Sequence, residues 1–403
     1  MPTMPSMLAL SELKVLEMGQ LIAGPFCAKT LGDFGAQVTK IEPPEGDPLR
    51  RWRVMRGDTS LWWHVQSRNK RSVGIDLRLP EGQALARRLA SQTDVLIENF
   101  SPGTLEKWGM SYEELSRDNP GLILVRISGF GQTGPRRDSP GFGVVGEAMG
   151  GLRHLSGEPG RRPVRVGVSI GDTLAALHGV IGIFAALEAR RQTGRGQVVD
   201  VALHESVFNV MESLLPEYTE AGVVREPAGS ALPGITPSNA YPCVDGLVLV
   251  AGNGDGIFRR LMEAIGRTDL RDDPGLADNS GRNQRASEID DAIGAWTSLQ
   301  SVEAVIQALQ QVRVPAGRIF TAKDIAEDPH FQARDMILKT QAYDGLPIHQ
   351  PGIVPKLSET PGSIRQRAPR VGEHTQEVLR EAGLSDAEIL ELLQQQVIHS
   401  HSS

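Results

Sequence analysis

The sequence predicts an α/β fold in which an open, doubly wound sheet of mostly parallel strands carries helices on both faces. Residues 13–18 and 37–42 have the composition of buried strands, and residues 26–34 between them have helical spacing. A strand, a helix and a strand within about thirty residues form a βαβ unit, whose right-handed crossover makes the two strands parallel. The pattern continues with strands expected at 72–77, 94–98 and 122–127 and an amphipathic helix at 80–91. Such alternation is typical of a doubly wound sheet.

The middle of the chain predicts a change of domain. A long apolar helix is expected at 174–190 and a strand at 196–203. Composition then changes at Arg225, where a stretch rich in glycine, proline and serine begins, and we place a domain boundary there. Residues 247–251 open a second, smaller α/β segment. The expected domains are therefore 1–224, 225–332 and 333–403.

The C-terminal segment carries a helix start signal. Ser385, with Glu388 three residues later, forms the sequence pattern of a capping box, so a helix is expected to begin there. Residues 399–403 follow the last apolar residues and are expected to be mobile.

Composition argues against several classes of main partner. The chain has 403 residues, of which 40% are hydrophobic, and a formal net charge of -7. Nucleic acids and anionic membranes repel an acidic chain, so we expect neither as a partner. The only cysteines are Cys27 and Cys243, and no two histidines stand four residues apart, so we expect no disulfide framework and no metal site. Residues 1–8 lack the regions of a signal peptide, which favours the cytoplasm.

Two basic clusters stand out in this acidic chain, Arg50–Arg53 with Arg56, and Arg68–Arg71. Each is either solvated loop charge or a site for polyanionic substrates, because a guanidinium matches a carboxylate or phosphate in bidentate geometry. The residues alone leave both interpretations open.

Three further positions have a plain structural interpretation. The turn Gly19–Pro25 is not a G-x-G-x-x-G motif, and Pro25 offers no N–H to a phosphate, so a dinucleotide site is disfavoured. Asn99 and Phe100 follow an expected strand, at the edge where open α/β sheets bind ligands, although such residues are also common in turns. Asp172, considered alone, has the position of a helix N-cap.

A series of motifs extends along nearly the whole chain. They are Leu13-x-Val15-Leu16-Glu17, Ala23-Gly24-Pro25, residues 31–42 (LGDFGAQVTKIE), Gly46-Asp47, residues 69–72 (NKRS), residues 98–103 (ENFSPG), residues 127–135 (ISGFGQTGP), Gly171-Asp172, residues 194–200 and residues 372–375 (GEHT). Each motif is weak evidence by itself, but the occurrence of all of them in this order is specific for one family. The chain resembles the class III CoA-transferase family, which includes formyl-CoA transferase and the carnitine and bile-acid CoA-transferases.

The resemblance implies a role for each matching residue. Asp172 matches the aspartate that forms acyl-anhydride and aspartyl-CoA thioester intermediates, and the glycine loop that closes over it is matched by Gly252, Gly254 and Gly256. The residues that match positions along CoA are Ala23, Asn69, Lys70, Arg71, Asn99, Phe100 and Lys107. The resemblance also implies a large α/β domain built from both chain ends, a small α/β domain from the middle, and an interlocked homodimer of ring-like subunits.

Three positions depart from the family pattern. Pro43 stands where formyl-CoA transferase has an arginine beside CoA, so another base, such as Arg68 or Arg71, is expected to meet the phosphates. Phe142 and Gly143 stand where that enzyme has tyrosine and glutamate, which argues against a formyl-CoA and oxalate pair. Phe142 also replaces the catalytic histidine of the related α-methylacyl-CoA racemases, and phenylalanine cannot transfer a proton.

The expected activity is the transfer of CoA from an acyl-CoA donor to a short carboxylic acid through covalent intermediates on Asp172. An enzyme carboxylate suits this exchange because donor and acceptor are carboxylates of similar basicity. Arg51 and Arg53 could hold the far carboxylate of a diacid, so we expect succinyl-CoA as donor and itaconate or glutarate as acceptor. Coenzyme A and acyl-CoA are substrates, and no tightly bound cofactor is expected. A racemase-like isomerase and a non-catalytic CoA-binding relative stay open as alternatives.

Overall fold

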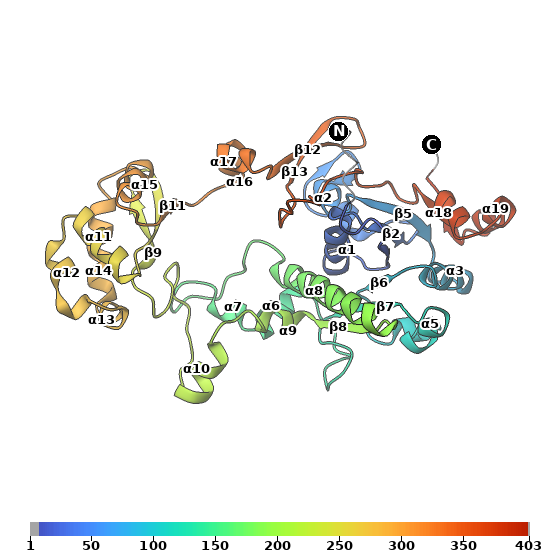
Figure 1. Ribbon diagram of the computed structural model, residues 1–403, viewed down its shortest axis with the longest axis horizontal. Coiled ribbons are helices and arrows are strands. Elements are labelled where there is room, and N and C mark those ends of the chain that lie inside the picture. The colour runs from blue at the N-terminus through green and yellow to red at the C-terminus, as the bar shows by residue number, and fades with distance from the viewer. Residues whose placement is uncertain (1–7, 402–403) are drawn as a thin grey trace. The chain divides into compact units, whose positions relative to one another are not determined.

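The computed structural model describes residues 8–401, and the chain divides into two compact units, each described here by itself (Figure 1). The larger unit consists of the residues up to Leu152, of Val166–Glu212 and of the residues from Ala333 onward. The smaller unit consists of Arg153–Arg165 and Ser213–Gln332. Both ends of the chain therefore build the larger unit.

The main stretch of the smaller unit runs from Ser213 to Gln332, so it begins before residue 225, where the sequence places a domain boundary. The difference arises from helix α10 (Leu214–Ala221), which Arg225 ties to the residues that follow it. The Arg225 guanidinium donates to Ser213 Oγ at 3.1 Å and to Glu217 Oε2 at 3.0 Å. The stretch whose composition suggested the boundary begins only after α10.

A seven-stranded sheet forms the larger unit, in the order β14-β5-β2-β1-β6-β7-β8. All neighbours are parallel except β14, which runs antiparallel to β5. From β1 the chain builds one side of the sheet through β2 and β5, and β6, β7 and β8 then build the other side. This confirms the doubly wound α/β sheet. The strands are β1 (Lys14–Glu17), β2 (Gln37–Glu42), β5 (Lys70–Ile75), β6 (Val95–Glu98), β7 (Ile123–Ser128), β8 (Val198–Ala202) and β14 (Ile398–His399).

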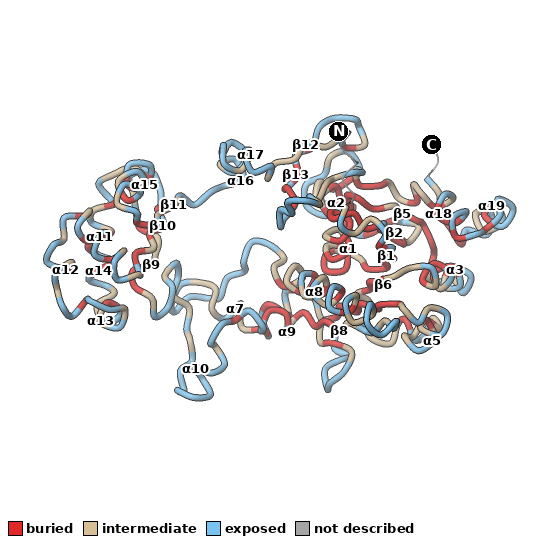
Figure 2. Tube along the Cα trace, in the orientation of Figure 1, coloured by how far each residue is buried: buried red, intermediate tan, exposed pale blue. Residues whose placement is uncertain are grey.

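Alternate strand residues pack into two apolar cores, one on each face of the sheet. Leu16 and Leu96 belong to one core, and their neighbours Val15 and Val95 belong to the other. This period of two is the geometry of an extended strand covered on both faces. Figure 2 shows the buried residues concentrated along these strands and along α1. The helices of the larger unit are α1 (Ala23–Asp33), α2 (Leu61–Gln66), α3 (Pro80–Ala90), α4 (Thr104–Lys107), α5 (Tyr112–Asp118), α6 (Gly143–Met149), α8 (Ile170–Thr193), α9 (Leu203–Phe208), α18 (Thr375–Glu381), α19 (Asp386–Gln394) and the 3₁₀ turn Pro48–Arg51.

Helix α8 is long and apolar enough to cross a membrane, by length and composition alone, with a mean hydropathy of 1.7. In this structure it packs along α1, β7 and β8, as the core helix of a folded domain does. Its side chains Ala175, Ala176 and Ile183 are fully buried in the core shared with α1. Packing inside the fold therefore accounts for only part of its apolar character, because 33% of its most apolar stretch is buried.

Two small hairpins complete the larger unit, and the smaller unit has its own sheet. The hairpins pair β3 (Met55–Arg56) with β4 (Thr59–Ser60) and β12 (Ile337–Gln341) with β13 (Pro347–Pro351). The smaller unit contains an antiparallel sheet in the order β11-β10-β9, covered by helices that share one apolar core with it. The chain passes from one unit to the other within α7 (Leu152–Leu155) and within α17 (Pro329–Ala333). The strands and helices of the smaller unit are β9 (Ser238–Cys243), β10 (Gly246–Ala251), β11 (Ala316–Arg318), α10, α11 (Asp255–Ala264), α12 (Thr268–Asp272), the 3₁₀ turn Pro274–Leu276, α13 (Asn279–Gln284), α14 (Ala286–Thr297), α15 (Val302–Gln311) and α16 (Ala322–Glu327).

Two helices begin earlier than the sequence predicts. The helix expected at 26–34 begins at Ala23, so Pro25 lies in its first turn, where a missing N–H leaves no hydrogen bond unmade. The helix expected at 174–190 begins at Ile170, so Asp172 lies inside the helix and Ser169 is the N-cap. The expectation that Asp172 occupies the N-cap position is therefore wrong.

The C-terminal segment is more ordered than expected. Ser385 and Glu388 form the predicted capping box at the start of α19. His399, expected to be mobile, belongs to β14, and His401 N donates to Gly372 O at 3.2 Å. Backbone pairing with the edge strand β5 holds this segment in place. Residues 402–403 of the expected mobile tail, and residues 1–7 of the segment examined for a signal peptide, lie outside the described residues.

Candidate active site

The candidate site begins at the carboxyl ends of β1 and β6, where the strand order of the sheet changes direction. Such a switch point leaves a crevice into which the loops after the two strands project. The loop after β1 leads through Gly19–Ile22 into α1, and the loop after β6 leads through Asn99–Gly103 into α4.

Asn99 joins these two loops through both ends of its side-chain amide. Its Oδ1 accepts from Gln20 N at 2.8 Å, and its Nδ2 donates to Gln20 O at 2.9 Å. Gly19 permits this close approach, because a β-carbon there would lie 3.0 Å from Asn99 Oδ1. Asn99 therefore sets the position of the loop after β1.

Buried charges support the same loop from inside the protein. Lys40 Nζ donates to Gly19 O at 2.7 Å and lies 2.8 Å from Glu17 Oε1 and 2.9 Å from Asp47 Oδ2. Burial by itself lowers the pKa of Lys40, but the carboxylates of Asp47 and Glu17 outweigh burial and raise that pKa. Lys40 therefore stays charged while its side chain is completely enclosed.

The same group of charges holds two further points of the loop. Lys70 Nζ donates to Pro25 O at 2.8 Å and lies 2.7 Å from Glu17 Oε2. The Asp47 carboxylate accepts from Leu21 N at 3.1 Å, which helps to hold Leu21 at a φ of 64°, a left-handed conformation that side chains other than glycine rarely adopt. The loop is therefore fixed at Gly19, Leu21 and Pro25.

A cavity of about 330 Å³, named here the strand-end cavity, opens beside these loops. Its walls come from the ends of β1, β2 and β5 and from the segment that follows β6. Phe100 and Trp108 line it edge to face, with ring centroids 5.2 Å apart. Aromatic and aliphatic walls of this kind can hold a flat ring such as adenine.

Phe100 is held in place by a buried ion pair behind it. Its backbone N donates to Glu98 Oε2 at 2.7 Å, and Arg126 Nε donates to Glu98 Oε1 at 2.8 Å. Burial raises the pKa of Glu98 to about 7, although Arg126 opposes this shift. The strand-end cavity therefore has a rigid aromatic wall.

Asp172 lies half-buried in the first turn of α8, against the first residue of α6. The N-terminal N–H groups and the dipole of α8 favour its ionised form. A β-carbon on Gly143 would lie 2.6 Å from Asp172 Cγ, so the absence of a side chain at position 143 makes room for this carboxylate.

A second cavity, of about 390 Å³, reaches the start of α8 and is named here the helix-start cavity. Ser169 and Thr173, on either side of Asp172 in the sequence, contribute to its lining. Its remaining walls are mostly apolar and come from α1, α2 and the segment before β3. Arg53 also lines it, with its guanidinium 4.5 Å from the centroid of the Trp62 ring.

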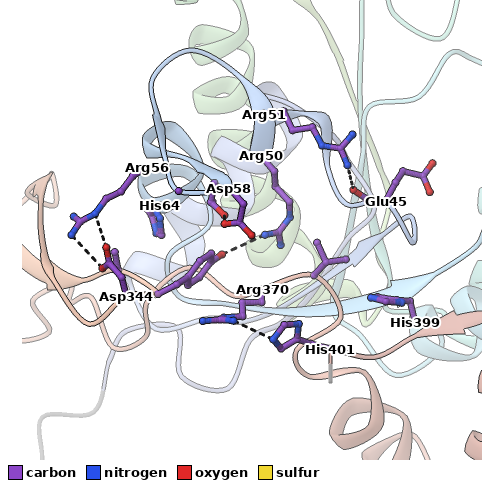
Figure 3. Close-up of a pocket in the computed structure, with 15 residues that line it drawn as sticks. Glu45, Arg50, Arg51, Arg56, Asp58, His64, Asp344, Arg370, His399 and His401 are labelled. Carbon is purple, nitrogen blue, oxygen red and sulfur yellow. Dashed lines mark hydrogen bonds and ion pairs between the residues drawn. The ribbon is translucent and has the colours of Figure 1, made fainter. Parts of the chain in front are cut away.

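A third cavity, of about 530 Å³, is named here the arginine cavity (Figure 3). Arg50, Arg51 and Arg56 line it, together with Arg370, and none of its lining residues belongs to the helix-start cavity. Arg51 Nη2 donates to Glu45 O at 3.0 Å, and Arg56 forms a bidentate pair with Asp344. Arg51 and Arg53, predicted together as ligands of a substrate carboxylate, therefore lie in different cavities.

Among the predicted CoA ligands, Phe100 lines the strand-end cavity, Lys107 is exposed on the neighbouring α4, and Ala23 is buried at the start of α1. Asn69 is enclosed, because its Nδ2 donates to Asp33 Oδ1 at 3.0 Å and its Oδ1 accepts from Arg365 N at 2.7 Å. Asn69, like Lys70, therefore has its polar atoms engaged within the protein.

The bases expected to meet the CoA phosphates have protein partners instead. Arg68 is buried and donates from Nε and Nη2 to both carboxylate oxygens of Asp33, at 2.9 and 2.7 Å. Arg71 lies 2.8 Å from Glu381 Oε2. The structure does not support Arg68 as a phosphate ligand, because binding a phosphate would require breaking a buried ion pair.

The predicted glycine loop belongs to the smaller unit, between β10 and α11. Arg282, which is fully buried, donates to Asn253 O and to Asp255 Oδ1, each at 2.8 Å. This contact holds the segment Gly252–Gly256. A catalytic role of these glycines stays a prediction. Across residues 8–401, no group of three or more histidine, cysteine, aspartate or glutamate side chains is arranged to hold a metal ion.

The larger unit is thus a doubly wound α/β sheet with an aspartate in the first turn of α8 and an apolar cavity that reaches the start of this helix. The sequence profile of CoA-transferase family III matches residues 10–375. The chain belongs to this family and is a class III CoA-transferase.

Characterised relatives and a solved structure support this assignment. A succinyl-CoA–D-citramalate CoA-transferase of Chloroflexus aurantiacus is 47% identical and covers 96% of this chain and 98% of its own. A succinyl-CoA–L-malate CoA-transferase beta subunit of the same organism is 42% identical, covering 97% and 98%. A succinate–glutarate CoA-transferase of Agrobacterium fabrum is 36% identical, covering 92% and 95%. The crystal structure of a CAIB/BAIF family protein from Brucella suis superposes with a TM-score of 0.82 at 34% identity, covering 93% and 99%.

Proposed function

We propose that this enzyme transfers CoA from succinyl-CoA to a short dicarboxylic acid, with Asp172 as the covalent carrier. The position of Asp172 carries the proposal. It lies in the first turn of α8, against a glycine that leaves room for its carboxylate, and its neighbours Ser169 and Thr173 line a cavity. A carboxylate in this setting can be ionised, partly shielded from water and close to a bound acyl group.

Four bond exchanges complete the reaction. An Asp172 carboxylate oxygen attacks the thioester carbon of succinyl-CoA, the carbon–sulfur bond breaks, and CoA leaves as a thiolate. The thiolate then attacks Asp172 Cγ, which breaks the anhydride and releases succinate. The acceptor carboxylate attacks the aspartyl thioester and again frees the thiolate, which finally attacks the acyl carbon of the new anhydride. Asp172 leaves this last step as a free carboxylate, so no proton or water is consumed.

In this reaction the protein positions the substrates and stabilises charge, and it does not need to supply a proton. The start of α8 stabilises negative charge on Asp172, as the dipole of a helix does at its N-terminus. The strand-end cavity offers aromatic walls for the adenine of CoA. The loop Gly19–Pro25 beside this cavity is held rigid by the buried lysines Lys40 and Lys70. We propose that Gly252, Gly254 and Gly256 close over the anhydride and protect it from water.

The names of the relatives support the substrate class. They describe succinyl-CoA or succinate paired with citramalate, malate or glutarate, which are all short dicarboxylates. Glutarate, expected from the sequence, is within this set, and itaconate, expected as the other acceptor, has the same charge and a similar length. We propose that the acceptor pocket selects acids whose two carboxylates are separated by a chain of about the length found in these acids.

We further propose that the enzyme acts in the cytoplasm as a homodimer. Helix α8 presents an apolar row to the outside of its unit, with Leu177 41%, Ile181 64% and Phe184 47% exposed. Their spacing places them on one face of the helix. A second subunit would remove such a row from water.

The experiment that tests the proposed function compares the natural enzyme with Asp172→Asn. Succinyl-CoA and citramalate, malate, glutarate or itaconate are supplied, and new CoA thioesters are identified by mass. We expect transfer by the natural enzyme and its loss in Asp172→Asn, with an unchanged melting temperature. Full transfer by the variant would refute the role of Asp172. Exchange of the α-proton in heavy water without any acceptor would instead indicate a racemase-like isomerase.

A further inference from the structure

The basic segment from residue 50 to residue 56 contains four arginines, and the structure gives their guanidinium groups different surroundings. Arg50 forms a bidentate pair with Glu42, at 2.8 and 2.7 Å, and Arg56 forms one with Asp344. Arg51 donates to a backbone oxygen in the arginine cavity. For Arg53, no carboxylate among residues 8–401 lies within ion-pair distance, and its guanidinium rests on the face of Trp62.

The backbone of Arg53 is held in an uncommon conformation. Its φ is 61°, in the left-handed region, and such strain persists only where the surroundings enforce it. Trp62 is held by two contacts. Its ring lies 6.3 Å from that of Trp52, and its backbone N donates to Ser60 Oγ at 3.0 Å. Arg53 is therefore directed toward the helix-start cavity by a strained backbone and a braced aromatic ring.

The helix-start cavity provides the remaining parts of a site for a short diacid. Ser169 and Thr173, which flank the proposed carrier Asp172 in the sequence, line it. Ile22, Phe26 and Val65 offer apolar surface to a methylene chain. A guanidinium on an aromatic face at the edge of an apolar cavity can pair with a carboxylate at lower desolvation cost than a lysine would incur.

We infer that Arg53, and not Arg51, binds the distal carboxylate of the substrate and thereby selects dicarboxylic over monocarboxylic acyl groups. This inference rests on the proposed function, because it needs an acyl group attached next to Ser169 and Thr173. The same contact serves donor and acceptor in turn, since each occupies the site as an acyl group on the carrier aspartate.

The test compares succinyl-CoA with butyryl-CoA, which has the same number of acyl carbons but a methyl group in place of the distal carboxylate. Arg53→Met keeps an unbranched stem on Trp62 and removes the charge. We expect the ratio of kcat/KM for succinyl-CoA to that for butyryl-CoA to fall roughly tenfold. Arg53→Lys should lose less, because it keeps the charge without the planar fork.

Arg51→Met is the matched control, since it removes the same group two positions away, in the arginine cavity. Its ratio should stay at the natural value. An unchanged ratio in Arg53→Met, or an equal fall in Arg51→Met, would overturn the inference while leaving the function intact. If Arg53→Met melts at a lower temperature, the equally uncharged Arg53→Gln decides in its place, and an unchanged ratio there overturns the inference. Failure of the natural enzyme to transfer CoA from either donor would instead refute the proposed function.

Discussion

A β-carbon on Gly143 would lie 2.6 Å from Cγ of Asp172, and closer still to its Oδ2. The two residues stand in the first turns of different helices, α6 and α8. Any side chain at position 143 must therefore displace the carboxylate or separate the two helix ends. Position 143 directly determines where the carboxylate of Asp172 lies.

Gly143→Ala should reduce kcat by about 100-fold, because a shift of about 1 Å in a reacting group is enough for such a loss. The free energy of unfolding should fall by no more than about 3 kcal/mol, the usual range for overpacking. Steady-state kinetics and urea unfolding measure the two effects. Gly167→Ala is the control, because a β-carbon there meets open space. Full activity in Gly143→Ala would show that the carboxylate tolerates displacement.

Asn99→Ala should raise the KM for succinyl-CoA, because the loop after β1 loses both hydrogen bonds that tie it to the loop after β6. The loss of these two bonds should cost about 1–3 kcal/mol of unfolding free energy. Asn119→Ala removes a comparable amide, which donates to Thr93 O at 2.7 Å, and should leave the KM unchanged. Equal KM values in the two variants would contradict the role of Asn99.

Lys40→Met should lower the free energy of unfolding by about 3–5 kcal/mol, because it removes the buried cation of Asp47 and leaves Glu17 with Lys70 alone. Lys323→Met, which removes an exposed lysine paired with Glu327, should change it by less than about 0.5 kcal/mol. Chemical unfolding of both variants at neutral pH gives the comparison. A small effect at Lys40 would mean that solvent reaches this group of charges.

Much of the fold could be predicted from the sequence because its strands are short apolar runs separated by helical periodicity. Strand β2 has the bounds expected, and the order of strands and helices in the larger unit follows the βαβ pattern. The sequence places the starts of α1 and α8 too far along the chain. The reason is that neither Ile22 nor Ser169 forms a side-chain cap that the sequence would reveal.

The site was predictable only in part. Asp172 was found through the family motif, but its contact with Gly143 depends on the crossing of two helices, which no local pattern encodes. Lys40 offered a signal that was missed: a lysine in the interior of an apolar strand must have a buried partner. Arg51 and Arg53 are nearly adjacent in sequence, and only the folded segment shows that they line different cavities.

The stability of the larger unit should depend on pH through His64. This histidine is buried, and its ring lies 4.8 Å from that of Tyr343. Burial, with help from the positive charges of Arg56 and Arg50, lowers the pKa of His64 below its usual value of 6.5. The unfolded chain therefore binds a proton more readily than the folded chain. Stability present above pH 6.5 is lost progressively as the pH falls toward the folded pKa.

His64→Gln should remove this contribution, so the variant should lose less stability than the natural protein between pH 7.5 and pH 5. Urea unfolding at several pH values measures both slopes. The lost contact with Tyr343 lowers the variant's stability at every pH and does not alter the slope. Other histidines, including His374, whose pKa is also lowered by burial, titrate equally in both proteins and cancel. Parallel slopes would show that His64 is protonated as readily in the folded protein as in the unfolded chain.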